Sequence, residues 1–321
     1  MRYVVLVLIA AGLGVFAFYG WIQQSLQMPG PLQKNTIVYI EPGSGTKKIA
    51  AQLFDEGAIE SPFIFSWGVK QSGATLKAGE YEIPEAAPTQ SIIALLDSGK
   101  TYQRRVTIPE GLTSQEIVDL VNAAEVMTGK VETVPPEGTL LPETYNYSRG
   151  DAREAVVERM SKAMKTAISD LWSKHQENPL LKTSEDAVTL ASIVEKETAL
   201  AAERPRVAGV FFNRLKINMP LQSDPTVIYA LTGGKAKLGR LLTRADLDYT
   251  SPYNTYGNPG LPPGPIANPG RASLEAVMNP ETNEYLYFVA NGTGGHTFAK
   301  TLDEHNHNVA KWRETQSQQK P

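Results

Sequence analysis

The hydrophobic pattern of the chain begins with an uncharged apolar run over residues 3–22. About 20 apolar residues in a helix are enough to cross the roughly 30 Å hydrocarbon layer of a membrane. Arg2 precedes the run, and Tyr19 and Trp21 lie near its end, where aromatic rings favour the membrane interface. We therefore expect residues 1–22 to form an uncleaved single-pass anchor with its N-terminus inside. A cleaved signal peptide is the alternative, although its apolar region normally ends in small residues.

A change to polar residues follows, and after it comes a pattern of short elements. Residues 23–35 are polar with Pro29, Gly30 and Pro31, which predicts a linker that holds the body off the membrane. Alternating apolar positions then predict strands, and helical spacing predicts helices. The strands are expected over 37–40, 76–83 and 102–108, and the helices over 47–56, 90–99 and 109–121.

A strand, a Pro-x-Gly turn and a capped helix occur twice, over 37–56 and 103–124. In the second copy Thr113 and Glu116 have the spacing of a capping box. This weak repeat resembles small LysM-like carbohydrate-binding modules, and an ordinary strand–helix packing unit would explain it equally well. We expect a LysM-like α/β subdomain over residues 36–105.

The rest of the chain is mostly helical, with a long loop region. Helical spacing covers 151–175 and 184–215, with a break near Pro205. The stretch 221–270 is rich in Pro, Gly, Tyr and Asn, which predicts ordered turns of the kind that often contact substrates. A helix over 271–278, a strand over 285–290 and a helix over 302–312 complete the pattern. We therefore expect an α+β protein whose catalytic domain covers 106–321, with its core over 185–312.

Composition excludes several classes of site. The 321 residues carry a net charge of −3, so no overall positive field would hold a nucleic acid. There is no cysteine, which excludes disulfides, zinc–thiolate sites and a thiol nucleophile. Hydrophobic residues make up 41%, enough for a core of ordinary size.

Two glutamates on the predicted helix over 184–215 are the main candidates for chemistry. At about 100° per residue, Glu197 falls within the apolar arc near Leu190, and Glu195 falls at the edge of that arc. A carboxyl beside apolar surface has a raised pKa, which a general acid needs near neutral pH. The alternative is that one or both glutamates pair with nearby arginines, of which the sequence offers Arg204, Arg206 and Arg214.

Other catalytic layouts have less support. His296, His305 and His307 lack a standard metal-ligand spacing on one helix, so we expect no metal site. The sequence contains no nucleophile-elbow motif, phosphate loop or dinucleotide fingerprint. We therefore expect no cofactor.

Several linked motifs together resemble the YceG-like family of endolytic murein transglycosylases. They are LASIVEKET over 190–198, RVAGVFFNRL over 206–215, MPLQSDPTVIY over 219–229, YNTY over 253–256, GLPPGPI over 260–266, NPG over 268–270 and HTF over 296–298. Upstream, GTLLPETY over 138–145 and the apolar N-terminus are similar too. The order of these motifs makes the resemblance specific and extends it over nearly the whole chain.

The resemblance implies a bacterial inner-membrane protein with its body outside the cytoplasm. It implies cleavage of the β-1,4 bond between N-acetylmuramic acid and N-acetylglucosamine within nascent strands, which leaves 1,6-anhydro ends. The catalytic glutamate of the family is carried onto Glu195, and Glu197 is the second candidate. Possible substrate-binding residues are Asn213, Gln222, Asp224, Tyr229, Asn254, Tyr256 and His296.

Peptidoglycan strands are the expected partner, and peptidoglycan synthases are a further partner that the resemblance suggests. Two other functions stay open. One is a hydrolytic muramidase with Asp224 or Glu197 as the second acid. The other is a peptidoglycan-binding protein without catalysis.

Overall fold

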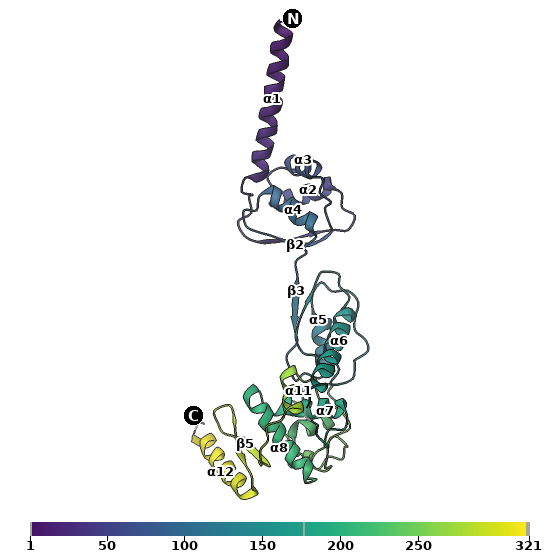
Figure 1. Ribbon diagram of the computed structural model, residues 1–321, viewed down its shortest axis with the longest axis vertical. Helices are drawn as coiled ribbons and strands as arrows, with labels where there is room; N and C mark the ends of the chain where they lie inside the picture. The colour runs from purple at the N-terminus through teal and green to yellow at the C-terminus, as the bar shows by residue number, and fades with distance from the viewer. Residues whose placement is uncertain (1, 176, 319–321) are drawn as a thin grey trace. The chain divides into compact units, whose positions relative to one another are not determined.

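The computed structural model describes residues 2–175 and 177–318, which fold into two compact units (Figure 1). Unit 1 comprises the chain up to Arg104 together with Asn146–Gly150, and unit 2 comprises Arg105–Tyr145 and the chain from Asp151 onward. Helices and small antiparallel sheets occur in one chain, so the expected α+β class is confirmed. The sequence analysis put the domain boundary at 105/106 and did not assign the returning segment Asn146–Gly150 to the first unit.

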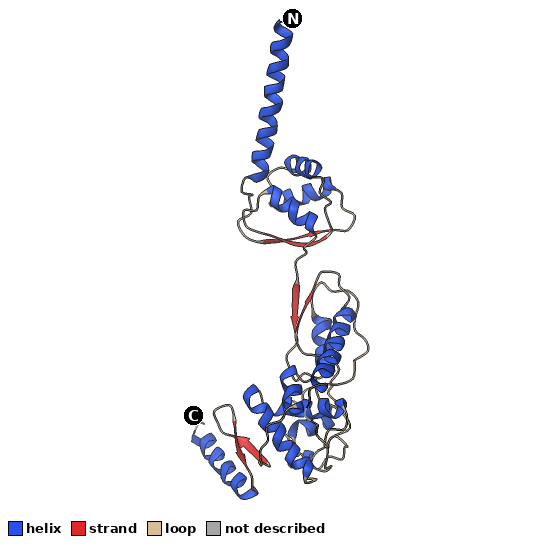
Figure 2. Ribbon diagram, in the orientation of Figure 1, coloured by secondary structure: helices blue, strands red, loops and turns tan. Residues whose placement is uncertain are grey.

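Unit 1 is a two-stranded sheet covered by helices (Figure 2). Strands β1 and β2 pair antiparallel, with Thr36 opposite Ile83 and Ile40 opposite Gly79. Val38, Ile40, Tyr81 and Ile83 are buried against the helices, because alternate residues of a strand face the same side. In chain order the elements are α1 (Arg2–Gln27), β1 (Thr36–Ile40), α2 (Thr46–Asp55), α3 (Pro62–Ser72), β2 (Gly79–Ile83) and α4 (Thr89–Ser98).

The end of α1 belongs to the core of unit 1. Ile22 and Leu26 lie one helical turn apart and are 0% and 4% exposed. Gly68 of α3 lets the two helices approach, because a Cβ at this position would lie 2.8 Å from Leu26 Cδ2. Gly30, further along, donates its backbone N–H to Ala86 O at 3.1 Å. The expected linker over 23–35 is therefore wrong, because the residues after the apolar run continue the helix and then pack onto unit 1.

The exposed part of α1 precedes these buried positions. Within the described residues, α1 is the helix that is long and apolar enough to cross a membrane. A signal sequence would have the same length and composition.

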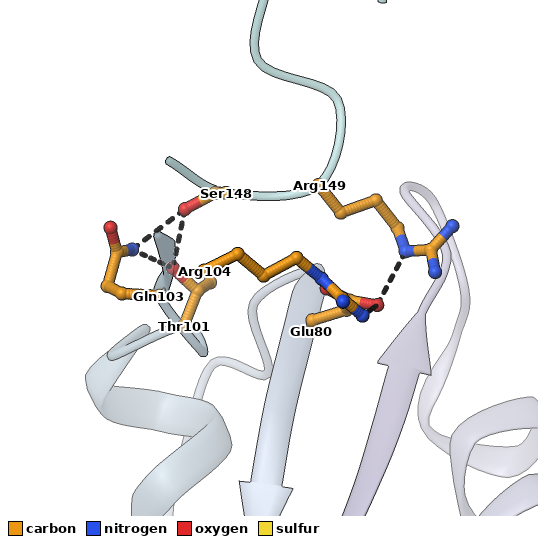
Figure 3. Close-up of polar contacts among 6 residues, drawn as sticks. All are labelled: Glu80, Thr101, Gln103, Arg104, Ser148 and Arg149. Atoms are coloured by element: carbon orange, nitrogen blue, oxygen red, sulfur yellow. Dashed lines mark hydrogen bonds and ion pairs between the residues drawn. The ribbon is translucent and has the colours of Figure 1, made fainter. Parts of the chain in front are cut away.

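A buried carboxylate fastens the two segments by which the chain leaves and re-enters unit 1 (Figure 3). Glu80 on β2 is 3% exposed and accepts hydrogen bonds from Arg104 Nε at 3.1 Å and Arg149 Nε at 2.7 Å. Beside them Gln103 Nε2 donates to Ser148 Oγ at 2.8 Å. Burial alone would raise the pKa of Glu80, but the two arginines outweigh it and hold that pKa below its usual value.

Unit 2 is mainly helical and has its own core. Its helices are α5 (Ser114–Ala123), α6 (Arg153–Trp172), α7 (Ser184–Glu197), α8 (Arg204–Lys216), α9 (Asp224–Thr232), α10 (Arg244–Leu247), α11 (Arg271–Met278) and α12 (Leu302–Gln318), with a 3₁₀ turn over Ala201–Glu203. Strand β3 (Arg104–Thr107) pairs with β4 (Thr144–Tyr147), and β5 (Tyr287–Ala290) pairs antiparallel with β6 (His296–Ala299).

Helix α7 lies at the centre of unit 2, in contact with α6, α8, α9 and α11. It begins with a capping box, in which Thr183 and Asp186 satisfy each other's backbone N–H groups. Leu190, Ile193 and Val194 are fully buried. A helix surrounded in this way brings even its polar side chains into the interior, and both candidate glutamates lie in its last turn.

Two prolines begin helices where the sequence analysis expected a break or a turn. The helical stretch 184–215 is interrupted over 198–203, and Pro205 lies in the first turn of α8. Pro225 likewise lies in the first turn of α9, inside the region expected to be all turns. The backbone N–H groups of a helix's first turn have no acceptor within the helix. Proline, which lacks this N–H, is therefore favoured there.

Candidate active site

The end of α7 opens into a pocket of about 450 Å³ within unit 2. Glu197, the last residue of the helix, contributes to its wall. Three of the residues expected to bind substrate line the same pocket: Gln222, Asp224 and Tyr256. The remaining wall is formed by Arg214, Tyr287, Phe288, Leu302, His305 and Asn306.

Glu197 has the environment of a carboxyl group that keeps its proton. Burial raises its pKa, and the negative charge of Asp224 raises it further. The Ser223 hydroxyl donates to Glu197 Oε1 at 2.5 Å, and this bond together with the charges of His296 and Arg214 acts in the opposite direction. The net effect is a raised pKa, so the proton is held at a pH where an exposed glutamate would have lost it.

Glu195 has a different environment, although it precedes Glu197 by only two residues. Its side chain is 4% exposed, and Oε1 accepts a hydrogen bond from Arg204 Nη2 at 3.0 Å. Oε2 accepts the backbone N–H of Gly270 at 2.8 Å. Arg204 also pairs with Glu110 at 2.8 Å, so the guanidinium joins two carboxylates. Glu195 thus has the arginine partner that the sequence analysis kept as an alternative for both glutamates.

The two side chains diverge because residues two apart on a helix point about 200° apart. Glu195 points toward Gly270, at the start of α11, and toward Arg204 of α8. Glu197 points toward Ser223, just before α9. One helix therefore supplies a carboxylate fixed by an ion pair and a carboxyl that faces a pocket.

Asp224 and Tyr256 form a second polar group in the pocket. The Tyr256 hydroxyl donates to Asp224 Oδ1 at 2.6 Å. Burial, this hydrogen bond and the nearby acids raise the pKa of Tyr256, so the phenol stays protonated. Gln222 adopts a left-handed backbone conformation with φ of 49°, and its N–H donates to Thr255 O at 3.0 Å.

The four other expected residues do not line this pocket: Asn213, Asn254, Tyr229 and His296. The side-chain amide of Asn213 donates to Asn283 O and Tyr285 O, and that of Asn254 donates to Leu247 O and Tyr249 O. Both asparagines thus fasten loops. Tyr229 packs on the ring of Tyr253 with centroids 4.9 Å apart, and burial, with help from Glu137 and Tyr253, raises the pKa of Tyr229 to about 12.

His296 lies close enough for its charge to act on Glu197, although it does not line the pocket. Its Nδ1 lies 2.7 Å from Glu203 Oε2, and its backbone N–H donates to Glu203 Oε1 at 2.9 Å. The ring also meets Phe288 edge to face at 5.3 Å. Glu203 therefore fixes both the backbone and the ring of His296.

Sequence reasoning assigned no role to Ser223, which contacts Glu197, or to several residues of the pocket wall. Ser223 stood within a quoted motif, but nothing in the sequence indicated that its hydroxyl would meet Glu197. His305 of α12 stacks on Tyr287 with centroids 5.2 Å apart, and its Nδ1 has no hydrogen-bond partner among the described residues. Burial and the charge of Arg214 lower the pKa of His305, so its ring is neutral near pH 7. The described residues contain no group of three His, Asp or Glu side chains arranged to hold a metal ion.

Comparisons with known proteins place the chain in a family. The model of the YceG-like family matches residues 38–311. An endolytic murein transglycosylase of Bacillus subtilis is 35% identical over 85% of this chain and 84% of the relative. An endolytic murein transglycosylase of Streptococcus pneumoniae is 31% identical over 96% of this chain, which spans 64% of that longer relative.

A solved structure agrees with these comparisons. The crystal structure of a yceG-like protein from Listeria monocytogenes has a TM-score of 0.53 and 36% identity to this chain. The match covers 85% of this chain and 99% of the Listeria chain. The family model, the relatives and the structure agree, and the chain belongs to the YceG-like family.

Proposed function

We propose that this chain is an endolytic murein transglycosylase, a lyase that cuts peptidoglycan strands, with Glu197 as its proton donor. The activity is supported by the names of the relatives, which match most of this chain. The choice of residue is supported by one observation above all. Glu197 lines a pocket and has a raised pKa, whereas Glu195 is held by Arg204 and a backbone N–H.

This proposal reverses the order of the two glutamates that the motif resemblance suggested. A general acid must reach the substrate and must carry a proton when it binds. The pocket and the pKa of Glu197 meet both needs. Glu195 is held by Arg204 and by the backbone N–H of Gly270, which suits it to a structural role that joins α7, α8 and α11.

In the proposed reaction Glu197 donates its proton to the glycosidic oxygen as the bond to the muramic anomeric carbon breaks. The bonding electrons leave with that oxygen, and positive charge develops at the anomeric carbon. The Glu197 carboxylate then takes the proton of the sugar's own C6 hydroxyl, whose oxygen bonds to the anomeric carbon. The products are a free hydroxyl end and a 1,6-anhydro end, no water is consumed, and one carboxyl group serves both steps.

Asp224 supports a second candidate, a hydrolytic muramidase. It lines the same pocket as Glu197 and could activate a water molecule, as the second acid of a glycosidase does. Its hydrogen bond from Tyr256 favours a different role, in which the aspartate and the phenol hold sugar hydroxyls and acetamido groups. We prefer the transglycosylase because relatives of this chain carry that name.

The test is mass spectrometry of glycan strands digested with the wild type, Glu197→Gln and Glu195→Gln. We expect anhydro ends, lighter than reducing ends by one water, from the wild type. Glu197→Gln should lose nearly all turnover while it stays folded. Glu195→Gln should lower the free energy of unfolding by about 3 kcal/mol, as expected for a broken buried ion pair, and should keep turnover at temperatures where it is folded.

Other outcomes would contradict separate parts of the proposal. Reducing ends from the wild type would favour the muramidase. A folded Glu195→Gln without turnover, beside an active Glu197→Gln, would return the catalytic role to Glu195. Full activity in both variants would mean that neither glutamate is the proton donor, and no cleavage by the wild type would favour the non-catalytic binding protein.

We further propose that α1 is an uncleaved anchor in the bacterial inner membrane, with both units outside the cytoplasm. The length and composition of α1 support a membrane span, and the burial of Ile22 and Leu26 in unit 1 supports retention of the helix. Cleavage after these residues would remove part of that core. The LysM-like role of unit 1 and an association with peptidoglycan synthases remain predictions from the resemblance.

A further inference from the structure

Four aromatic side chains form a continuous exposed patch where α1 meets unit 1. Phe18 and Trp21 come from α1, and Phe63 and Trp67 come from α3. They are 45%, 52%, 54% and 36% exposed. Phe18 joins the two helices, because its ring centroid lies 5.9 Å from that of Trp21 and 6.2 Å from that of Trp67. We call these four residues the aromatic patch.

The aromatic patch is held in place by packing and hydrogen bonds behind it. Gln71 of α3 donates to the Tyr19 hydroxyl at 2.8 Å and accepts from Gln23 at 2.7 Å. Gly68 of α3 lies directly against Leu26 of α1. Helix α3 therefore has a fixed position beside the point where the apolar run of α1 ends (Figure 1).

We infer that unit 1 rests on the surface of the lipid bilayer through the aromatic patch. The inference depends on the proposed membrane anchor, since it takes α1 to span the bilayer. Phe18 and Trp21 then lie at the membrane interface, the region that tryptophan and other amphipathic rings prefer. Because Trp67 touches Phe18 and Phe63 touches Trp67, the exposed rings of α3 lie beside the same interface.

The chemistry of α3 fits a lipid surface. Phe63, Trp67 and Lys70 have i, i+4 and i+7 spacing, so they share one face of the helix. Lys70 is exposed and forms no ion pair among the residues that the structure describes, so its ammonium is available to lipid phosphates. Exposed apolar surface of this kind marks a contact site, and its continuity with α1 identifies the bilayer as the occupant.

The test uses the full chain in phosphatidylcholine–phosphatidylglycerol vesicles whose lipids are brominated either near the carbonyl end or near the middle of the acyl chain. The chain has four tryptophans, at positions 21, 67, 172 and 312. One variant keeps only Trp67 and another keeps only Trp21, with phenylalanine at the other three positions. We expect the shallow bromines to quench most of the emission of each tryptophan, and the deep bromines to quench less.

Two control variants separate the aromatic patch from the rest of unit 1. Tyr39→Trp, with the other tryptophans replaced by phenylalanine, puts the probe on β1, away from α1 within unit 1 (Figures 1 and 2), and should show no quenching. Added to the variant that keeps Trp67, Phe63→Asp should lower the quenching. Phe54→Asp, at a comparably exposed phenylalanine of α2 outside the aromatic patch, should leave it unchanged.

Each failure has a distinct meaning. If Trp21 is quenched and Trp67 is not, the surface contact is wrong and the anchor stands. If neither is quenched, the anchor itself is wrong and the inference falls with it. A second copy could instead cover the patch. Trp67 emission would then be blue-shifted but not quenched by lipid bromines, and quenching would appear only when the chain is diluted in the vesicles. This result would overturn the inference.

Discussion

The two glutamates of α7 differ because their partners differ. Glu195 accepts hydrogen bonds from a guanidinium and a backbone N–H, which fix its side chain in place. Glu197 meets a hydroxyl and a neighbouring acid, and burial dominates its pKa. Single substitutions can therefore separate the two roles by stability as well as by turnover.

Glu197→Gln should be more stable than the wild type at neutral and alkaline pH. The pKa of Glu197 is raised in the fold, so its stabilising contribution is complete below the unfolded-state pKa and is lost as the pH rises through the folded-state pKa. Glutamine resembles the protonated form and cannot lose a proton. Denaturant unfolding over a pH series should thus show the two proteins close together in acid and diverging as the pH rises, and parallel curves would contradict this.

Ser223→Ala should move the alkaline limb of the activity profile to higher pH. The Ser223 hydroxyl lowers the pKa of Glu197 by its hydrogen bond, so its loss leaves the proton held more strongly. The measurement is the rate of glycan cleavage against pH. The matched control is Ser273→Ala, which removes a buried hydroxyl that has no hydrogen-bond partner among the described residues. A shift to lower pH, or an equal shift in the control, would count against the assignment of Glu197.

The sequence predicted the burial of the two candidate glutamates better than it predicted their contacts. Periodicity correctly put both acids in or beside a buried face of one helix. It could not separate them, because the partners come from Gly270, Ser223 and Arg204, and only the fold brings these together. The contribution of His305 was equally hidden, since α12 reaches the pocket through its packing on β5 and β6.

At the scale of elements, local sequence signals predicted several helices well, and packing overrode these signals in two places. Apolar spacing predicted α6 and α11 closely, and α4 ends at Gly99, which adopts the left-handed conformation. Helix α3 was missed because Phe63 and Trp67 are exposed, which obscures its amphipathic pattern. The residues after position 22 read as a linker because Ile22, Leu26 and Leu32 are spaced among polar residues, yet all three are buried.

Glu80→Gln should loosen the attachment of Arg104 and Arg149 to β2 (Figure 3). Breaking a buried ion pair costs about 3 to 5 kcal/mol, and we expect about 2 kcal/mol here because both arginines are partly exposed. The pKa of Glu80 is lowered, so its contribution is present above the unfolded-state pKa and is lost as the pH falls through the folded-state pKa. The unfolding free energies of wild type and variant should therefore converge in acid, and a constant difference would argue against the ion pairs.

The division of the molecule into two units predicts how it unfolds. Each unit has a separate set of buried apolar residues, one around α7 and one around the β1–β2 sheet. Two cores of this kind should give two calorimetric transitions for the full chain in detergent micelles, since a single cooperative transition is a property of single domains. One close glycine contact in each unit allows the transitions to be assigned.

Gly30→Ala should lower the melting temperature of one transition, and Gly209→Ala should lower that of the other. A Cβ at position 30 would lie 2.4 Å from the backbone oxygen of Ala87, and one at position 209 would lie 2.4 Å from that of Glu281. A backbone atom cannot turn aside as a flexible side chain can, so each substitution should cost about 1 to 3 kcal/mol and several degrees. Calorimetry of the double variant should show both shifts unchanged, because substitutions in separate cores with no shared partners add. If either single variant moves both transitions together, the two cores are coupled and the chain unfolds as one cooperative body.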